Sequence, residues 1–422
     1  MLKVLVIGNG AREHALVWKL SQSPKVAEIY AAQGNAGIAS KAKIISIKPT
    51  DIESLAAAAQ EKRIDLTVVG PEVPLSQGIV NTFGNRGLRI FGPSKAAARI
   101  EASKVFSKEL MQKYGIPCAK SKNFTSYETA SNYVNKQHCP IVIKADGLAA
   151  GKGVIIANTT DEALTALSDI MEKRAFGDAG DSVVVEEFLA GKEVSLLVFT
   201  DGSTVVPMVP ACDYKRVGDG DTGLNTGGMG SYSPPGFFGS DMVKKVKETI
   251  LEPVVKAMAK EGYPYKGVLY AGLMVTAEGP KVMEFNCRFG DPETQAMLPR
   301  LDTDLVDIML AVIDGNLKKI KIHWRNDACV GVILASGGYP GKYATGLPIT
   351  GLDTVDDDVM VFHAGTKSND GRICTDGGRV LTVTALGRNI AEARDKVYRN
   401  ISRITFNGCH YRRDIGQREV AG

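Results

Sequence analysis

The chain contains little cysteine and little histidine. Its 422 residues include seven cysteines and five histidines. The cysteines lie far apart, form no CxxC pair and are odd in number, so we expect reduced, buried thiols and a cytoplasmic protein. The histidines show no metal-ligand spacing, which argues against zinc and haem chemistry.

A strong charge of one sign and a long apolar run are also missing. With 51 basic and 47 acidic side chains the net charge is +4, which gives no reason to expect nucleic acid or a membrane as a partner. No stretch approaches the roughly 20 apolar residues of a membrane-spanning helix. Residues 1–7 run directly into Gly8 and are more typical of a first strand than of a signal peptide. We therefore expect small-molecule partners, with a monomer as the working expectation.

Glycine, by contrast, is abundant, with 45 residues in short loops that suit a backbone folded around a ligand. The length favours about two to four domains. Residues 1–101 alternate short apolar runs with helical patterns, which predicts a parallel α/β domain. Hairpin signals predict a different domain over 102–327, and 328–422 is expected to be a small α+β domain in which we identify no catalytic set. One continuous helical segment is expected over 94–114.

Three strand ends of the first domain carry glycine turns. They are Gly8-Asn9-Gly10, Gly70-Pro71-Glu72 and Gly92-Pro93-Ser94, and ligands of parallel sheets bind at such carboxyl ends. The first turn begins like a dinucleotide fingerprint, but Glu13 occupies the third glycine position. A strand, a glycine turn and a helix start still predict an anion site there. A nicotinamide-dependent oxidoreductase stays open as an alternative, with Glu28 near the place of its ribose-binding acid.

Glu284 and Asn286 are two residues apart in a predicted strand, so their side chains leave the same face. A carboxylate beside an amide oxygen suits Mg²⁺, which takes its other ligands from water and phosphates. A solvated strand face is the plain alternative. In the turn that follows, Arg288 could clamp a phosphoryl group or a carboxylate. The alternative there is an ion pair between Arg288 and Asp291 that stabilises the loop.

A second polar set lies earlier in the chain. Lys144 ends a strand just before the glycine-rich turn 147–153, which carries Lys152. Backbone amides and a flexible cation in such a turn can cover phosphates. Two acids at 186–187 end another apolar strand, and Glu193 follows within a few residues. The plain alternatives are a hairpin tip and a surface edge.

Together these features resemble the ATP-grasp superfamily. The narrower resemblance is to the phosphoribosylamine–glycine ligase (glycinamide ribonucleotide synthetase) family of purine biosynthesis, and it covers essentially the whole chain. Its most specific motif is Arg288-Phe289-Gly290-Asp291-Pro292-Glu293-Thr294-Gln295. Further matching segments are 8–14, 70–72, 144–153, 213–216, 225–230 and 412–416.

The resemblance implies an N-terminal parallel α/β domain, a central ATP-grasp domain with a mobile lid over about 122–190, and a small C-terminal α+β domain. It implies that ATP, glycine and 5-phosphoribosylamine give glycinamide ribonucleotide, ADP and phosphate through glycyl phosphate. ATP is the co-substrate, and Mg²⁺ or Mn²⁺ is the implied metal ion. Many members of the superfamily carry another acidic ligand on the preceding strand, where hairpin register puts Gly272. We therefore expect ATP to supply most of the remaining metal ligands.

The site residues follow from the resemblance together with the strand ends described above. The metal ligands are Glu284 and Asn286, and the catalytic residues are Arg288 and Asp291. The ATP-binding residues are Lys104, Lys144, Gly151, Lys152, Gly153, Glu186, Glu187, Phe188, Leu189 and Glu193. The amine substrate is expected at Asn9, Gly10, Pro71, Glu72, Asp213, Lys215, Thr226 and Gly228. Another ATP-grasp ligase that uses bicarbonate or formate, and a regulatory protein that holds ATP without turnover, remain alternatives.

Overall fold

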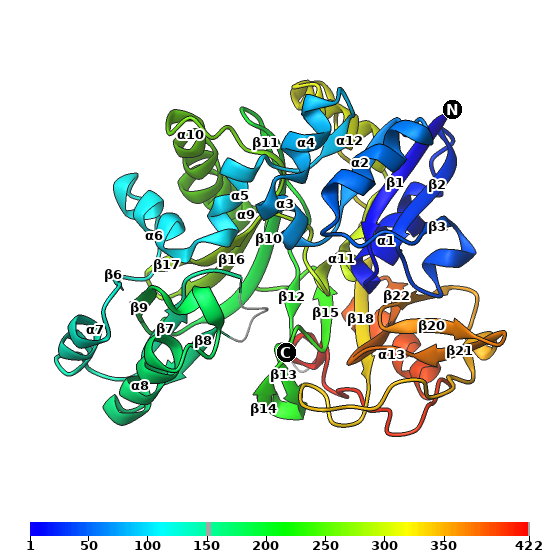
Figure 1. Cartoon of the computed structure of the whole chain (residues 1–422). Coiled ribbons are helices and arrows are strands. Elements are labelled where there is room, and N and C mark those ends of the chain that lie inside the picture. The colour runs from blue at the N-terminus through cyan, green and yellow to red at the C-terminus, as the bar shows by residue number, and fades with distance from the viewer. Residues whose placement is uncertain (149–152, 421–422) are drawn as a thin grey trace.

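The computed structural model describes residues 1–148 and 153–420 and consists of an N-terminal unit, a central body with a lid, and a C-terminal unit (Figure 1). The N-terminal unit is a parallel sheet in the order β3-β2-β1-β4-β5, which confirms the predicted α/β class. Its strands are β1 (Leu2–Gly8), β2 (Val26–Gln33), β3 (Lys43–Ile45), β4 (Leu66–Val69) and β5 (Ile90–Phe91). Its helices are α1 (Ala11–Leu20), α2 (Ile52–Glu61), α3 (Glu72–Gln77) and α4 (Ile79–Asn85).

The central body is built on an antiparallel sheet in the order β11-β10-β16-β17. The strands are β10 (Lys192–Asp201), β11 (Val205–Pro207), β16 (Lys266–Thr276) and β17 (Gly279–Asn286). The associated helices are α9 (Ser240–Val246), α10 (Glu252–Lys260), α11 (Glu293–Met297) and α12 (Leu305–Ile313). α12 packs on β10 and β16 and also touches β5, so it joins the central sheet to the N-terminal unit. The register of the last hairpin pairs Gly272 with Glu284, as predicted.

The lid is a second antiparallel sheet, in the order β6-β9-β7-β8. Its strands are β6 (Ser121–Phe124), β7 (Ile141–Ala145), β8 (Val154–Ala157) and β9 (Val183–Glu187), and its helices are α7 (Tyr127–Val134) and α8 (Thr160–Leu167). Its apolar core runs from Phe124 to Val185 in sequence and is separate from the cores shared by the other units. The lid therefore packs as a body of its own, to one side of the molecule in Figure 1.

The helical segment predicted over 94–114 is wrong as a single helix. The structure has α5 (Lys95–Ala102) and α6 (Lys104–Lys113), separated by Ser103. Ser103 is extended, with φ −133° and ψ 114°, and its Oγ accepts a hydrogen bond from Phe106 N at 3.1 Å. A serine in this conformation is a favourable N-cap, which ends one helix and begins the next. The break places Lys104 at the first position of α6.

The C-terminal sheet draws strands from two parts of the chain. Its order is β12-β15-β18-β22-β19, and α13 (Ile390–Ile401) packs on β18 and β22. The strands are β12 (Cys212–Asp213), β15 (Gly230–Ser233), β18 (Ala328–Ala335), β19 (Val359–His363) and β22 (Arg379–Gly387). Two small hairpins, β13 (Arg216–Gly218) with β14 (Thr222–Asn225) and β20 (Thr366–Asn369) with β21 (Arg372–Thr375), project from it. Asp213 and loop 225–230 are thereby attached to the C-terminal unit.

The start of α13 agrees with its sequence signal. Asn389 Oδ1 accepts a hydrogen bond from Glu392 N at 2.9 Å, so the predicted N-cap is confirmed. Across residues 1–148 and 153–420, no helix has both the length and the apolar character needed to cross a bilayer.

Candidate active site

Glu284 and Asn286 lie side by side on β17, where Asn286 Nδ2 donates to Glu284 Oε1 at 3.4 Å. Burial alone would raise the pKa of Glu284, but nearby cations outweigh burial and lower it, so the carboxylate stays ionised. Those cations are Lys144, Lys215 and Lys104. An ionised carboxylate beside an amide is a hard-oxygen pair whose chemistry fits Mg²⁺.

Gly272 stands opposite Glu284 across the ladder. A Cβ placed on Gly272 would lie 3.3 Å from Glu284 Cγ, so the Glu284 side chain extends over the glycine. In the part of the chain that the structure describes, no group of three or more His, Cys, Asp or Glu side chains could hold a metal ion. A metal ion on β17 would therefore take most of its ligands from water or a bound substrate.

Two lysines approach this strand from the lid side. Lys104, at the start of α6, donates to Gly147 O at 2.8 Å. Lys144, on β7, donates to Met283 O at 3.0 Å, and Met283 is the residue before Glu284. Lys144 of the lid thus contacts β17, the strand that carries Glu284 and Asn286. Gly153 closes the glycine turn, and its carbonyl accepts from Ala145 N at 2.9 Å.

Gly151 and Lys152, predicted to contact ATP, lie outside the described residues. The linker after β9 is described throughout, and Glu187 Oε1 accepts from Lys120 N at 2.9 Å. Phe188 is 41% exposed, whereas Leu189 is half-buried. An exposed aromatic ring at this position leaves an apolar surface beside the linker.

Glu186 has its carboxylate turned away from solvent. Its Oε2 lies 3.0 Å from Lys144 Nζ and its Oε1 lies 3.1 Å from Lys108 Nζ. The side chain was expected to bind ATP, but the groups it contacts are the two lysines. Lys108 was not among the predicted site residues, although its spacing of four residues from Lys104 puts both on one face of α6.

Lys215 connects Glu193, which is predicted to bind ATP, with residues that are predicted to bind the amine substrate. Its Nζ forms ion pairs with Glu193 and with Asp213, the latter at 3.1 Å. Burial raises the pKa of Asp213 to about 6, although Lys215 opposes the shift. Thr226 Oγ1 donates to Lys215 O at 2.9 Å and accepts from Gly228 N at 2.9 Å. Glu193 and Asp213 therefore share the Lys215 ammonium group, while Thr226 binds the backbone carbonyl of the same lysine.

Arg288 forms ion pairs with two acids, Glu72 at the start of α3 and Glu101 on α5. Its Nε lies 3.3 Å from Glu72 Oε2, and its Nη2 lies 3.3 Å from Glu101 Oε1. Arg288 also donates to Asn286 Oδ1 at 3.3 Å, which brings it next to Asn286 and Glu284 on β17. Glu101 was missed, because it lies in the helical segment 94–114 and carries no local signal. The other oxygen of Glu101 accepts from Cys287 N at 2.7 Å.

Asp291 is paired with an arginine of the C-terminal unit. Its Oδ2 lies 2.9 Å from Arg379 Nη2 on β22, and Gln295 Nε2 donates to its Oδ1 at 2.8 Å. Both Arg288 and Asp291 therefore have partners other than each other, unlike the loop ion pair considered from the sequence. The expectation of no catalytic set in 328–422 missed Arg379, which this geometry brings into the site.

A further acid, Glu293, was part of the predicted motif but was given no role. It is 2% exposed, and its Oε1 accepts from Tyr270 Oη at 2.8 Å and from Ser195 Oγ at 3.0 Å. These two hydroxyls come from β16 and β10, so Glu293 fixes the start of α11 on the central sheet.

The first glycine turn is occupied by the protein itself. Glu13 Oε2 accepts from Gly10 N at 2.6 Å and so caps the start of α1. A Cβ on Gly70 would lie 1.9 Å from Glu13 Oε1, and one on Gly8 would lie 2.6 Å from Glu13 Cγ. The anion at this helix start is therefore the Glu13 carboxylate, which corrects the anion site predicted from the sequence. Asn9 remains exposed beside it.

The β4 turn contributes Pro71 and Glu72. Pro71 is extended, with ψ 156°, and precedes the first residue of α3. Glu72 extends from that helix to Arg288. The turns that follow β1 and β4 thus lie next to each other, since a Cβ on Gly8 would be 3.1 Å from Pro71 Cδ.

The oxidoreductase alternative is wrong for geometric reasons. Besides the filled glycine turn, Glu28 pairs with Lys3 near the start of β1, whereas Gly8 pairs with Gln33. Glu28 and Gln33 are five positions apart, which is roughly 16 Å along a strand. The acid thus lies at the wrong end of β2 for a nucleotide ribose.

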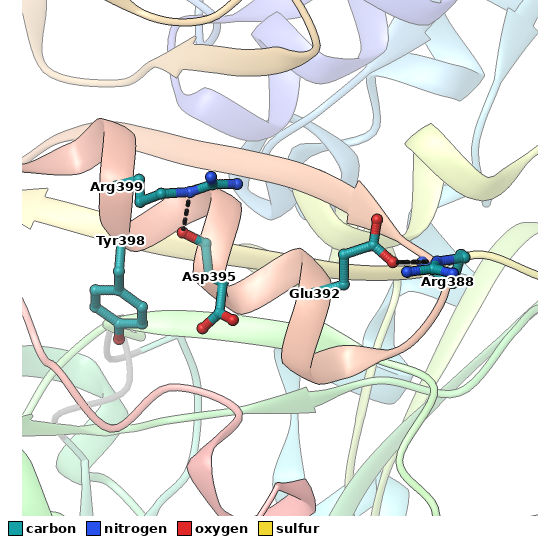
Figure 2. Close-up of a pocket in the computed structure, with 5 residues that line it drawn as sticks. All are labelled: Arg388, Glu392, Asp395, Tyr398 and Arg399. Carbon is teal, nitrogen blue, oxygen red and sulfur yellow. Dashed lines mark hydrogen bonds and ion pairs between the residues drawn. The ribbon is translucent and has the colours of Figure 1, made fainter.

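The hollows of the described structure include two that differ in their relation to this site. One, of about 450 Å³, lies between the N-terminal unit and the lid beside Gly147 and is lined by Ser76, Ala102, Asp146, Gly147, Leu148, Phe176, Asp178 and Ala179. Another, of about 670 Å³, lies along α13. Figure 2 shows its charged lining, with Glu392 turned toward Arg388 at 2.7 Å. The α13 hollow shares no residue with the site, whereas the first adjoins the Lys104 contact.

Comparisons with known proteins find one and the same family along this chain. Models described as the N domain, the ATP-grasp (A) domain and the C domain of phosphoribosylglycinamide synthetase match residues 2–101, 102–294 and 329–418. The phosphoribosylamine–glycine ligase of Caldanaerobacter subterraneus is 52% identical over 98% of this chain and 99% of its own length.

Solved structures are similar as well. The crystal structure of phosphoribosylamine–glycine ligase from Thermotoga maritima is 35% identical, with a TM-score of 0.87 over 98% of this chain and 100% of that chain. The biotin carboxylase domain of a Hydrogenobacter thermophilus carboxylase, solved with MgADP, shares the fold alone. It is 16% identical, with a TM-score of 0.75 over 97% of this chain and 92% of that chain.

Proposed function

Because the chain belongs to the phosphoribosylglycinamide synthetase family, we infer that it is a ligase that joins glycine to phosphoribosylamine in purine biosynthesis. An ATP-grasp domain makes ATP the co-substrate, with a divalent metal ion. The contact of Lys144 Nζ with Met283 O at 3.0 Å supports the residue roles that we propose, because it joins the lid to the strand that carries Glu284.

The chemistry explains why ATP is needed. The carboxylate of glycine is a poor acyl donor, because oxide or hydroxide cannot leave. Attack of a glycine carboxylate oxygen on the γ-phosphorus breaks the bond to ADP and forms glycyl phosphate. The amine nitrogen of phosphoribosylamine then attacks the acyl carbon, phosphate leaves, and the nitrogen loses a proton. The products are glycinamide ribonucleotide, ADP and phosphate.

ATP is proposed to lie between the lid and β17. Lys104 and Lys144 would bind its phosphates, since both ammonium groups lie near the ionised Glu284. The turn that contains Gly151, Lys152 and Gly153 would cover the phosphates and exclude water, which would hydrolyse the acyl phosphate. The linker Glu186, Glu187, Phe188 and Leu189 would flank adenine, and Glu193 would bind the ribose.

Glu284 and Asn286 are proposed as the protein ligands of Mg²⁺ or Mn²⁺. Their fit rests on the lowered pKa of Glu284, on the adjacent amide oxygen, and on the neutral glycine opposite. The ion would offset negative charge on the ATP phosphates when bound. Arg288, which donates to Asn286 Oδ1, would orient this amide and neutralise charge on the transferring group.

The amine substrate is proposed to lie between the N-terminal strand ends and Lys215. Asn9, Gly10, Pro71 and Glu72 would form one side. Asp213, Lys215, Thr226 and Gly228 would form the other side. Asp291 would act on the same side, since Arg379 holds its carboxylate beside loop 225–230. The filled glycine turn supports hydroxyl recognition by Glu13 or Glu72 over phosphate binding at that helix start, because anions repel each other.

The remaining proposals concern the whole chain. We propose domains at 1–101, 102–327 and 328–422, with a lid over about 122–190 that moves to admit ATP. We also propose that the protein is a monomer and that it is located in the cytoplasm. The domain proposal is supported by the separate core of the lid and by the extents of the matching family models.

The reaction is tested by mixing the protein with ATP, metal ion and a panel of carboxylates, with phosphoribosylamine generated in the assay. We expect ADP to form only when glycine and the amine are both present, with glycinamide ribonucleotide as the product. ADP release that needs no glycine, or equal rates with bicarbonate or formate, would identify another carboxylate–amine ligase. ATP binding without any turnover would identify a regulatory protein.

A further inference from the structure

Lys108, Glu186 and Lys144 form a buried charged triad from three elements. Lys108 Nζ lies 3.1 Å from Glu186 Oε1, and Lys144 Nζ lies 3.0 Å from Glu186 Oε2. Lys108 is 2% exposed, Glu186 is 3% exposed and Lys144 is 6% exposed. One carboxylate thus faces two ammonium groups, one on each oxygen. Buried charges are costly unless each has a close partner, so the second lysine requires an explanation.

The backbone determines this arrangement. Lys104 and Lys108 lie one turn apart on α6 and leave the same face. On the lid sheet, Lys144 pairs with Val184, two residues before Glu186, so Lys144 and Glu186 are diagonal neighbours on one face. The α6 face therefore presents one lysine to the glycine turn and the other to Glu186.

Lys144 is held by two acceptors. Among the residues that the structure describes, its Nζ donates a hydrogen bond to Met283 O and forms an ion pair with Glu186 Oε2. The position of the ammonium group therefore depends on how strongly Glu186 attracts it. Lys108 competes for that carboxylate from the opposite side.

We propose that Lys108 is a positioning residue for ATP, which shares Glu186 with Lys144 and so keeps the Lys144 ammonium available to the nucleotide phosphates. This inference rests on the proposed ATP site. Lys108 also leaves the triad with one excess positive charge in a dry environment. That excess is balanced when a polyphosphate arrives, so the buried charge favours the bound state.

Loss of Lys108 should weaken ATP binding in two ways. The whole charge of Glu186 would act on Lys144 and draw it from the phosphates. The triad would also become neutral, and its attraction for ATP would fall. A purely structural ion pair predicts neither effect, because its loss would lower stability without changing the affinity for one substrate selectively.

The test uses the full-length protein with Lys108→Met, which keeps the aliphatic stem and removes the charge. We expect the KM for ATP to rise roughly tenfold, with the KM for glycine changed by less than about twofold. Lys113→Met is the matched control, because Lys113 lies on the same helix and its side chain is 62% exposed. Thermal melting of every variant separates folding from binding.

A second substitution tests the charge argument. In Lys108→Met, the further change Glu186→Gln removes the excess attraction on Lys144, so the KM for ATP is expected to return toward the wild-type value. A double variant no better than Lys108→Met, or an unchanged KM for ATP in a folded Lys108→Met, overturns the proposal. If Lys108→Met does not fold, Lys108→Gln, which also removes the charge, replaces it in both variants and is measured by the same criterion.

Lys144→Met separates the positioning role of Lys108 from the proposed ATP site. A large rise in the KM for ATP in this variant, with none in Lys108→Met, refutes the positioning role and leaves the ATP site intact. An unchanged KM for ATP in Lys144→Met refutes the proposed ATP site itself.

Discussion

Arg379 Nη2 lies 2.9 Å from Asp291 Oδ2, so an arginine of the C-terminal sheet holds an acid of the loop after β17. Arg379 Nη1 also donates to Gly227 O at 2.6 Å. One guanidinium group thereby fixes both loops that we propose to surround the amine substrate. Arg379 is the contribution of the C-terminal unit to the site.

Replacing Arg379 by Met should therefore lower both stability and turnover. Asp291 would keep a buried charge without its main partner, so the free energy of unfolding should fall by about 2 kcal/mol. Urea denaturation measures this change. In a double-mutant cycle, Asp291→Asn should cost less in Arg379→Met than in the wild type. Equal costs in the two backgrounds would show that the pair is not coupled.

The metal proposal predicts the effect of Glu284→Gln. Turnover should fall roughly 100-fold, because electrostatic stabilisation of the phosphates is lost. Binding of Mn²⁺ in the presence of ATP, measured by electron paramagnetic resonance, should weaken in parallel. Glu278→Gln on the same hairpin is the matched control, since the Glu278 side chain is 77% exposed. Full turnover in a Glu284→Ala, Asn286→Ala double variant would contradict the proposed metal ligands.

The pH dependence of amine use should reflect Asp213. Burial raises the pKa of this carboxyl to about 6, so it is protonated below that pH and ionised above it. If the ionised form binds the amine substrate, kcat/KM for phosphoribosylamine should rise as the pH rises through about 6 and then level off. In Asp213→Asn, kcat/KM for phosphoribosylamine should no longer rise with pH in this range. If the variant shows the same rise as the wild type, another group is responsible for the pH dependence.

A second pH effect should appear in stability. His14 Nδ1 accepts from His363 N at 2.8 Å, and burial lowers the pKa of His14 to about 3. The unfolded chain takes up a proton near pH 6.5 whereas the folded chain does not, so stability present above that pH is lost as the pH falls toward 3. The loss by about pH 4 should be on the order of a few kcal/mol.

His14→Asn keeps an acceptor near Nδ1 and removes the proton site, so it provides the check. Urea denaturation between about pH 4 and pH 7 should show a shallower pH dependence for the variant. Identical slopes would mean that His14 is protonated in the folded protein. Burial also lowers the pKa of His363, to about 4, so part of the slope should remain.

Local patterns predicted the parts of the site that depend on neighbouring residues. Strand alternation puts Glu284 and Asn286 on one face, and the register of a short hairpin puts Gly272 opposite. The parallel N-terminal sheet likewise follows from the alternation of strands and helices. These features needed no knowledge of the distant chain.

Partners from distant segments could not be predicted in this way. Glu101 and Arg379 reach Arg288 and Asp291 only because three units pack together. Lys108 has the spacing of a helix face, but that spacing is equally typical of a solvated surface. The filled turn at Gly10 depends on the rotamer of Glu13, which no sequence period specifies.

The order of synthesis gives the shared C-terminal sheet a further consequence. β15 pairs with β18, and Ser231 lies opposite Gly331, so β15 can gain this partner only after about 100 further residues have been synthesised. At about 5–20 residues per second the wait is of the order of ten seconds. The lid, whose core lies within 124–185, can fold during that interval. A nascent chain can thus complete the lid well before Asp213 and loop 225–230 acquire their final support.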